Sequence, residues 1–483
     1  MKIVYSTANF QTAGGGEARV AYEMSEAFSK NHTVLLVSPG FTNTTYDLHP
    51  NLTKLEFKST GYEEFLIPHI TPKNLSFLYF HLDQFKPDII HSHDNTPLSA
   101  IVQAWARSRS VPFIFTSHEL FKRRTEFGIS EISKALTVLF DSRIIRNYYL
   151  DFFRNCDGVI ALNETAKKDI IDYGYTGRIF IIHNGRNLKQ YATLKLPDIS
   201  STERSLISIG WISERKNQLF LIQAMEYLPK NYSLHIIGGA LNEKYAQKLY
   251  SYVSSHHLSN VHFIGRVSPE AIPSWLERSH LLISSSKMEV QSLVVLEALA
   301  SGRPIVGLSN ETIDELISDT VGKRLPADTD PQTYAHQIQK LCSISPSKYL
   351  TLCKNARKLV HGYDWTDVIN KTIPAYESVI ALKKPMEIKA EGYKISRFSR
   401  FPRSAGRLVA ELRTLDKPLR TKITRFAGKP YIYLSVLMVL TLTGSAVYAL
   451  NSYIQKTGKS KQTIPRLSSN KKSLRRQVFR KSE

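Results

Sequence analysis

The feature that most constrains the fold is a double series of short apolar, β-rich runs separated by longer amphipathic ones. The first series comprises residues 3–6, 33–38, 88–93, 112–118, 157–162 and 179–184, and the second comprises residues 206–210, 234–239, 261–265, 280–285 and 304–308. Nearly continuous apolar strands that alternate with helices form parallel sheets covered on both faces. The sequence therefore predicts an α/β protein with two doubly wound domains that face a cleft.

A polar break near residues 199–204 separates the two series. We therefore expect an N-terminal Rossmann-like domain in residues 1–198 and a second one in residues 199–364. Ligands of open parallel sheets bind beyond the carboxyl ends of the strands. The polar residues that follow each strand are thus the candidates for chemistry.

The charge of the chain is concentrated at one end. The 483 residues carry a net charge of +22, of which +18 falls in residues 384–483 and +4 in residues 1–383. A nearly neutral body does not indicate nucleic acid as a partner. The three cysteines, Cys156, Cys342 and Cys353, lack metal-ligand spacing and fit a reducing compartment. No apolar stretch of signal-peptide length follows Met1.

Residues 430–455 form an uncharged stretch of 26 residues, which is long enough to cross a bilayer. Tyrosines near both of its ends are typical of interfacial anchors. A buried core helix is the alternative, but basic segments flank the stretch on both sides. We predict a single transmembrane helix at 430–455, followed by a basic tail at 456–483.

A basic linker, residues 385–429, leads into this stretch and interleaves arginines with Phe398, Phe401 and Phe426. It could be a solvated linker, a segment that contacts anionic lipid headgroups, or an RNA-binding segment. Its continuation into the apolar stretch favours membrane lipids as partners. The positive charges do not settle the orientation, because residues 411–430 and 454–473 each hold six Lys or Arg.

A glycine run, Gly14, Gly15 and Gly16, lies between the first predicted strand and a helix. Glycines let backbone N–H groups approach an anion, and a helix N-terminus adds a favourable dipole. The run is not a dinucleotide fingerprint, because Arg19 stands where the last glycine of G-x-G-x-x-G is needed. Contact with a phosphate or sugar and a simple flexible turn are both compatible with it.

Histidines end two strands of the first series. His93 closes the strand IIHSH, and His118 follows the strand FIFTS. Either could donate a hydrogen bond to a sugar hydroxyl or to a departing phosphate. A single histidine at a strand end is usually structural, but two at the same edge of a sheet favour a functional role.

Two cations, Arg215 and Lys216, stand at a strand-to-helix turn of the second series, in GWISERKN. A guanidinium can bind a diphosphate by two hydrogen bonds, and an ammonium can neutralise it as a point charge. Solvated surface cations would show the same pattern.

The most specific stretch is SSSKMEVQSLVVLEALASGRPIV, residues 284–306. Glu289 lies in a turn, and Ser292 caps a predicted helix that carries Glu297 and stops at Gly302. A phosphate at this helix N-terminus, beside Ser292 and Leu293, would have one carboxylate on either side. A sugar and a ribose could satisfy the two carboxylates.

Together these motifs resemble glycosyltransferase family 4, whose members have the GT-B fold of two Rossmann-like domains. The resemblance covers residues 1–384 and rests on the E-x7-E pair Glu289 and Glu297, the ALASGRP that follows, the glycine run, TSHEL and IIHNG. It implies transfer of a sugar from a nucleotide-sugar donor to an acceptor hydroxyl, with retention of configuration and without a metal or other cofactor. Residues 365–384 would form a helix that returns to the first domain.

The resemblance also implies roles at the donor. Glu297 would hold the ribose hydroxyls, Glu289 the donor sugar, and Arg215 with Lys216 the diphosphate. His118 would contact the donor sugar and the leaving phosphate. We therefore expect His118 and Glu289 to be the catalytic residues.

Further contacts follow from the same resemblance. Gly15 and Gly16 would close over the reacting groups, and Arg266 and Val267 would meet the base through their backbone. The Asp-x-Asp at residues 328–330 lies in a Pro-flanked loop, where turn chemistry is a better interpretation than a metal site.

The chain departs from the family pattern at two positions. Trp211 stands where an arginine is common, so phosphate neutralisation would rest on Lys216 and Arg215. Val290 replaces the glycine that usually follows the first glutamate, which narrows the space for a close backbone approach.

Nucleotide sugars are made in the cytosol, so the catalytic body is expected to face the cytoplasm and the predicted span to anchor it. The tail would then cross the membrane or lie in a re-entrant position. The acceptor would be a lipid-linked or membrane-proximal glycan. The alternatives are a catalytically silent GT-B scaffold tethered to the membrane, and a sugar phosphorylase or epimerase on the same fold.

Overall fold

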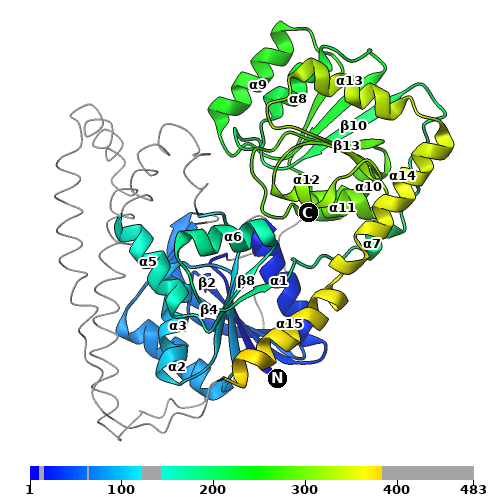
Figure 1. The fold of residues 1–483 in the computed structure, drawn as a ribbon. Coiled ribbons are helices and arrows are strands. Elements are labelled where there is room, and N and C mark those ends of the chain that lie inside the picture. Colours follow the sequence, from blue (N-terminus) through cyan, green and yellow to red (C-terminus); the bar gives the residue numbers. More distant parts are fainter. Residues whose placement is uncertain (10–15, 63–64, 122–142, 383–483) are drawn as a thin grey trace, which may run out of the picture.

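A computed structural model describes residues 1–9, 16–62, 65–121 and 143–382. It contains two α/β domains, each built around one sheet (Figure 1). The prediction of an α/β chain with two Rossmann-like domains is confirmed. The linker, span and tail predicted for residues 385–483 lie outside the described residues, as do Gly14 and Gly15. Within the described part of the chain, no helix is both long and apolar enough to span a membrane.

The first domain holds a nine-stranded sheet. Its strands are β1 (Lys2–Ser6), β2 (Thr33–Gly40), β3 (Thr44–His49), β4 (Leu52–Tyr62), β5 (Phe65–Pro68), β6 (Ile89–Ser92), β7 (Phe113–Ser117), β8 (Gly158–Ala161) and β9 (Ile179–Ile181). Its helices are α1 (Gly16–Ser29), α2 (Pro72–Phe85), α3 (Pro97–Ser108), α5 (Arg143–Arg154), α6 (Glu164–Tyr173) and α7 (Lys189–Ala192). The strand order is β3-β4-β2-β1-β6-β7-β8-β9, with β5 paired to β4.

Apolar strands explain the centre of this sheet. Ile3, Val4 and Tyr5 of β1 are fully buried, and β1 pairs in parallel with β2 and β6. Each predicted run of the first series contains one of the parallel strands. Their carboxyl ends therefore meet at one edge, where His93 and His118 follow β6 and β7.

The strands β3, β4 and β5 were not predicted. β3 is mostly exposed and polar, and β4 carries charged residues at buried positions, where Lys54 and Glu56 pair at 3.0 Å. Charged residues lower the local hydropathy, so a strand that buries an ion pair has the hydropathy pattern of a loop. Both β3 and β5 run antiparallel to β4.

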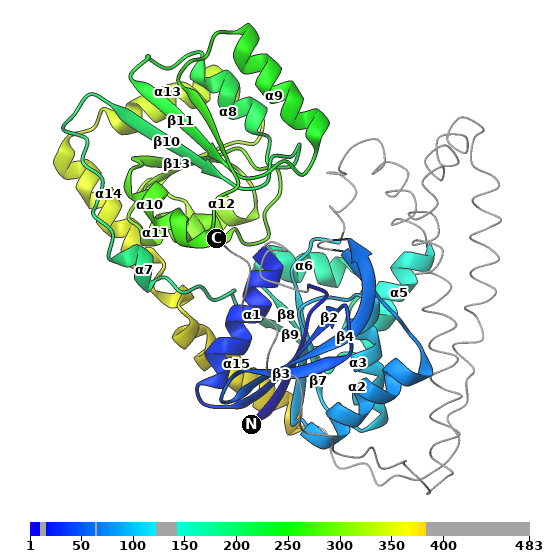
Figure 2. The ribbon, with the colours of Figure 1, turned by 180° about the vertical axis from the view of Figure 1, so that it is seen from behind.

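The second domain holds a six-stranded sheet in which all pairs are parallel. Its strands are β10 (Arg204–Ile209), β11 (Tyr232–Ile237), β12 (Val261–Gly265), β13 (Leu281–Ser284), β14 (Ile305–Leu308) and β15 (Gly322–Leu325), in the order β12-β11-β10-β13-β14-β15. The view from behind shows β10, β11 and β13 side by side (Figure 2). Only β15, with the sequence GKRL, lies outside the predicted runs.

The helices of this half complete the layers. They are α8 (Gln218–Met225), α9 (Glu243–Ser255), α10 (Ile272–Glu277), α11 (Leu293–Ala300), α12 (Glu311–Leu316), α13 (Pro331–Cys342), α14 (Pro346–Leu359) and α15 (Trp365–Ile380), with short 3₁₀ turns η2 (Pro269–Ala271) and η3 (His361–Tyr363). Asp330 caps α13, accepting a hydrogen bond from Thr333 N at 2.9 Å. Asp330 of the Asp-x-Asp segment is thus a helix cap, and that the segment binds no metal stays a prediction.

The last helix, α15, returns to the first domain and lies beside α1 (Figure 1). Its fully buried Tyr376 places its hydroxyl 3.1 Å from that of Tyr5 in β1 and 2.6 Å from His91 Nδ1 in β6. The chain thus crosses between the domains twice, before β10 and after α14.

Gly238, just beyond β11, gives a first prediction. Its φ is +148°, and a Cβ there would lie 2.0 Å from the carbonyl oxygen of Gly210. We expect Gly238→Ala to lower the free energy of unfolding by more than about 2 kcal/mol, because a backbone strand end must move. Urea denaturation measures this, with Gly362→Ala as the control, since no atom of the described residues beyond its chain neighbours lies within 4 Å of a Cβ at that position. Equal stability of the two variants would contradict the prediction.

Candidate functional site

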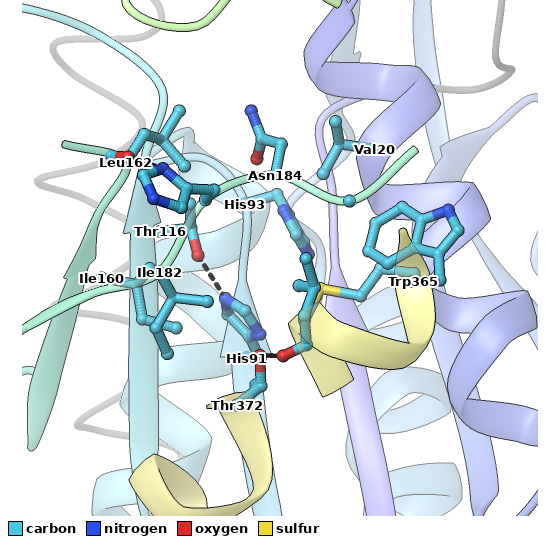
Figure 3. A pocket seen from close by; sticks show the side chains of 14 residues that line it. Val20, His91, His93, Thr116, Ile160, Leu162, Ile182, Asn184, Trp365 and Thr372 are labelled. Carbon is cyan, nitrogen blue, oxygen red and sulfur yellow. Dashed lines mark hydrogen bonds between the residues drawn. The ribbon is translucent and has the colours of Figure 1, made fainter. Parts of the chain in front are cut away.

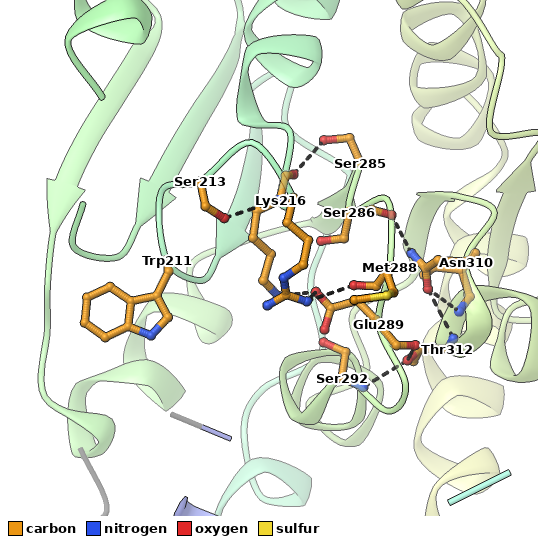
Figure 4. A network of polar contacts seen from close by, with 12 residues as sticks. Trp211, Ser213, Lys216, Ser285, Ser286, Met288, Glu289, Ser292, Asn310 and Thr312 are labelled. Carbon is orange, nitrogen blue, oxygen red and sulfur yellow. Dashed lines mark hydrogen bonds and ion pairs between the residues drawn. The ribbon is translucent and has the colours of Figure 1, made fainter. Parts of the chain in front are cut away.

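The candidate site lies at the carboxyl edge of the second sheet. β10 and β13 are neighbours, so the loop from β10 to α8 and the loop from β13 to α11 lie side by side. The first loop supplies Arg215 and Lys216, and the second supplies Glu289. Figure 4 shows Lys216 and Glu289 side by side. Residues more than 70 positions apart are therefore brought together because their strands pair.

Glu289 pairs with both cations. Its Oε1 lies 2.5 Å from Lys216 Nζ and 3.3 Å from Arg215 Nη1, and the same Nη1 donates to the Met288 carbonyl at 2.8 Å. Burial raises the pKa of Glu289, but the charges of Lys216 and Arg215 outweigh it and hold the pKa below its usual value. The cluster therefore combines an ionised carboxylate with two cations at the end of a sheet.

The loop that carries Glu289 is fixed from the α12 side. Glu289 N donates to Glu311 Oε2 at 3.0 Å, and Ser292 N donates to Thr312 Oγ1 at 2.9 Å (Figure 4). Ser292, which we expect beside the donor phosphate, is thus held through its backbone N–H by Thr312. Leu293 opens α11, where the first N–H groups have no acceptor within the helix.

Glu297, the second glutamate of the E-x7-E motif, contacts the first domain rather than the β10–α8 loop. It is only 2% exposed, and its Oε1 accepts from Arg186 Nε at 2.8 Å and lies 2.6 Å from Arg186 Nη2. Arg19 Nη1 of α1 is 3.7 Å from the same oxygen. Glu297 therefore lies in an ion-pair network between the two domains, whereas Glu289 lies with the β10–α8 loop.

Residues of the first domain donate hydrogen bonds to the loop between β13 and α11. Asn163 Nδ2 donates to Val290 O at 2.7 Å, and Asn184 N donates to Gln291 Oε1 at 2.7 Å. A Cβ on Gly16, at the start of α1, would lie 3.8 Å from Leu293 Cδ1. The end of the glycine run and the start of α11 thus face each other across the domain boundary.

His118 belongs to a stack of histidines in the first domain. Its Nε2 is 3.1 Å from His93 Nδ1, and the rings of His93 and His91 stack with centroids 4.6 Å apart. Burial lowers the pKa of His118 to about 3 and that of His91 to about 3. These imidazoles are therefore neutral near pH 7, so His118 can donate or accept a hydrogen bond without carrying a charge.

A small pocket lies beside this stack (Figure 3). His91, His93, Thr116, Asn184 and Trp365 are among its lining residues. His91 is satisfied by Tyr376 and by Thr116 Oγ1, at 2.6 Å each, whereas the buried Nε2 of His93 has no hydrogen-bond partner among the described residues. His91 is thus a structural residue, and His93 links the pocket to His118.

Arg266 and Val267, predicted to meet the base, follow β12. The guanidinium of Arg266 lies 5.3 Å from the centroid of the Trp211 ring, within the range of a cation–π interaction. Trp211, one of the two departures from the family pattern, therefore orders the side chain of Arg266. Val267 is half-buried and packs against the core.

Sequence reasoning missed Arg186 and Glu23. Arg186 follows IIHNG, is 4% exposed, and contacts both Glu23 of α1 and Glu297 of α11. The only signal in the sequence is a charged residue directly after the IIHNG run, beyond the end of β9 at Ile181. Its two partners lie 163 and 111 positions away, and no local pattern identifies them.

Two family models match consecutive parts of the chain. Glycosyltransferase Family 4 matches residues 14–190, and Glycosyl transferases group 1 matches residues 195–359. A relative, alpha-monoglucosyldiacylglycerol synthase of Streptococcus pneumoniae, is 26% identical over 254 residues, which is 49% of this chain and 55% of that protein. The enzyme of the same name from Acholeplasma laidlawii is 22% identical over 60% of this chain and 75% of its own length.

Solved structures share the fold. Sucrose-phosphate synthase from Thermosynechococcus elongatus has a TM-score of 0.66 at 18% identity and covers 79% of this chain and 99% of its own. HepE from Anabaena, in complex with UDP-glucose, has a TM-score of 0.61 at 18% identity and covers 78% of this chain and 100% of its own. Because the two family models together cover well over half of the chain, and the fold is that of these structures, the chain belongs to the glycosyltransferases of the GT-B fold.

Proposed function

We propose that the chain transfers a sugar from a nucleotide-sugar donor to an acceptor hydroxyl, with retention of configuration, and that the acceptor is a lipid-linked or membrane-proximal glycan. The observation that carries this proposal is the cluster of Glu289, Lys216 and Arg215 at the carboxyl edge of the second sheet. Ligands of open parallel sheets bind at this edge.

The chemistry that the cluster can support is electrostatic. When the bond from the anomeric carbon to the diphosphate breaks, negative charge grows on the leaving oxygen. Lys216 and Arg215 are held in place by Glu289 before the reaction, so they can stabilise that charge without reorganisation. A hydroxyl of the donor sugar can donate a hydrogen bond to the Glu289 carboxylate in the same complex.

The other residues take supporting roles in this proposal. Glu297 would accept from the ribose, the neutral His118 would contact the donor sugar and leaving phosphate, and Gly16 would lie over the reacting groups. Arg266 and Val267 would meet the base through their backbone. That the reaction needs no metal or other cofactor stays a prediction.

The proposed acceptor rests on two observations. Two relatives are named for synthesis of a glucosylated diacylglycerol, which is a lipid. In this chain an uncharged stretch at 430–455 follows an Arg- and Phe-containing linker. A single-pass membrane protein whose catalytic body faces the cytoplasm would meet both its soluble donor and its lipid acceptor.

The activity is tested by incubating the full-length protein in vesicles with a panel of nucleotide sugars and lipid acceptors. The expected result is one labelled product, whose anomer, read by NMR, matches that of the donor. A silent scaffold would turn over no donor. A sugar phosphorylase would need orthophosphate, and an epimerase would alter the donor sugar without an acceptor.

Deletion of residues 385–483 gives a second prediction. We expect transfer to an acceptor embedded in vesicles to fall at least about ten-fold, because the catalytic body is no longer concentrated at the surface. Hydrolysis of the donor in solution should stay within about two-fold of the full-length rate. A vesicle rate equal to that of the full-length chain would contradict the proposed role of this segment.

A further inference from the structure

We propose that Arg186 is a positioning residue that holds the Glu297 carboxylate for the donor ribose and joins donor binding to the placement of α1. The inference rests on the proposed function, because it assumes that Glu297 meets the ribose of the donor.

Arg186 lies where the two crossings between the domains meet. It follows β9 on the first crossing, and its backbone N–H donates to Tyr363 O, on the second crossing, at 2.9 Å. It also forms a parallel bridge with Asp364, the N-cap of α15. The backbone of Arg186 is therefore fixed to the second crossing, and the residue is 4% exposed.

The Arg186 guanidinium forms ion pairs with two carboxylates, one from each domain. Its Nε and Nη2 reach Glu297 of α11, at 2.8 and 2.6 Å, and its Nη1 donates to Glu23 of α1. Glu23 also accepts from Trp365 Nε1 at 3.2 Å, and Arg186 Nη2 donates to Tyr191 OH at 3.3 Å. Arginine suits this task, because its rigid fork stays charged and holds several acceptors at once.

The two contacts with Glu297 fall on the same oxygen, Oε1. This leaves Oε2 as the oxygen that a ribose hydroxyl would use. A buried carboxylate without a cation either takes up a proton or turns toward water. Arg186 thus pairs with the buried Glu297 carboxylate and orients it, and a hydrogen bond to a carboxylate is stronger than one to a neutral group.

The contact with Glu23 extends this effect to the first domain. α1 begins at Gly16, which faces Leu293 of α11 across the boundary. A shift of the Arg186 guanidinium would therefore change its contact with Glu297 of α11 and its contact with Glu23 of α1 together. Ribose binding at Glu297 and the position of α1, with Gly16 at its start, are linked through this one side chain.

If Arg186 were only structural, its substitution would weaken the binding of ribonucleotides and deoxynucleotides equally. Comparing a nucleotide with its deoxy forms therefore distinguishes a structural role from a positioning role. Full-length wild type is titrated calorimetrically with UDP, ADP, GDP and CDP, and the nucleotide that binds is then compared with its 2′-deoxy and 3′-deoxy forms. In wild type we expect at least one deoxy form to bind about ten-fold more weakly, as for a lost hydrogen bond to a charged group.

The same titrations are repeated with Arg186→Met and Arg186→Lys. In Arg186→Met we expect the ribonucleotide to bind about ten-fold more weakly and the ratio between ribo and deoxy forms to fall to about one. Arg186→Lys keeps a charge but loses the fork, so its ratio should lie in between. Thermal unfolding identifies a variant that does not fold, and Arg186→Lys then carries the test.

Lys216→Met serves as the matched control, because it should weaken the ribo and deoxy forms equally and leave their ratio unchanged. An unchanged ratio in folded Arg186→Met or Arg186→Lys would overturn the inference while leaving the proposed function intact. If wild type bound no nucleoside diphosphate at all, the proposed function itself would fail, and the inference with it.

Discussion

In a Lys216→Met variant the turnover number for sugar transfer is expected to fall about 10²–10³-fold. Lys216 Nζ is placed 2.5 Å from Glu289 and is the most buried cation of the cluster, with 14% of its side chain exposed against 34% for Arg215. A preplaced cation acts mainly on charge that develops in the transition state. The effect should therefore appear in kcat more than in KM.

Initial-rate kinetics with the identified donor measure this effect. The control is Lys230→Met, which removes an exposed cation of the same domain and should leave kcat unchanged. Arg215→Met should cost less than Lys216→Met, because Arg215 is more exposed and its charge is better screened. A Lys216→Met enzyme with wild-type kcat would show that the leaving diphosphate does not meet this lysine.

Glu289→Gln is expected to lower kcat/KM about 10–100-fold. Glutamine keeps the shape of the side chain but removes the charge, and a hydrogen bond to a charged group is stronger than one between neutral groups. The same change removes the partner that holds Lys216 and Arg215 in place. The combined variant with Lys216→Met should therefore lose less activity than the two single losses multiplied.

Rates of the single and double variants form the cycle that tests this coupling. Circular dichroism and thermal unfolding confirm that each variant folds. If the losses of the two single variants multiplied in the double variant, Glu289 and Lys216 would act independently. That result would contradict a shared site.

The layers of the fold could be predicted because apolar strands buried on both faces leave a continuous signal. β1, with Ile3, Val4 and Tyr5 fully buried, and β10, with Leu206 and Ile207, are examples. The strands that were not predicted carry charged residues, so their apolar pattern is interrupted. β4 buries Lys54 and Glu56 as a pair, and β15 carries Lys and Arg on an edge of the sheet.

The site could be predicted only in part, because residue types and local turns are visible in the sequence but strand order is not. Lys216 and Glu289 each follow a strand, and their meeting depends on the pairing of β10 with β13. The burial of Glu297 against Arg186 depends on how the domains pack. A spacing of eight positions carries no information about which partner each carboxylate faces.

The most direct test of the account is a crystal structure of the chain with its nucleotide-sugar donor. The predicted result is a diphosphate within hydrogen-bond distance of Lys216 Nζ, a donor-sugar hydroxyl on the Glu289 carboxylate and a ribose at Glu297. A donor bound away from the β10–α8 and β13–α11 loops, with the Lys216–Glu289 pair unchanged, would contradict it.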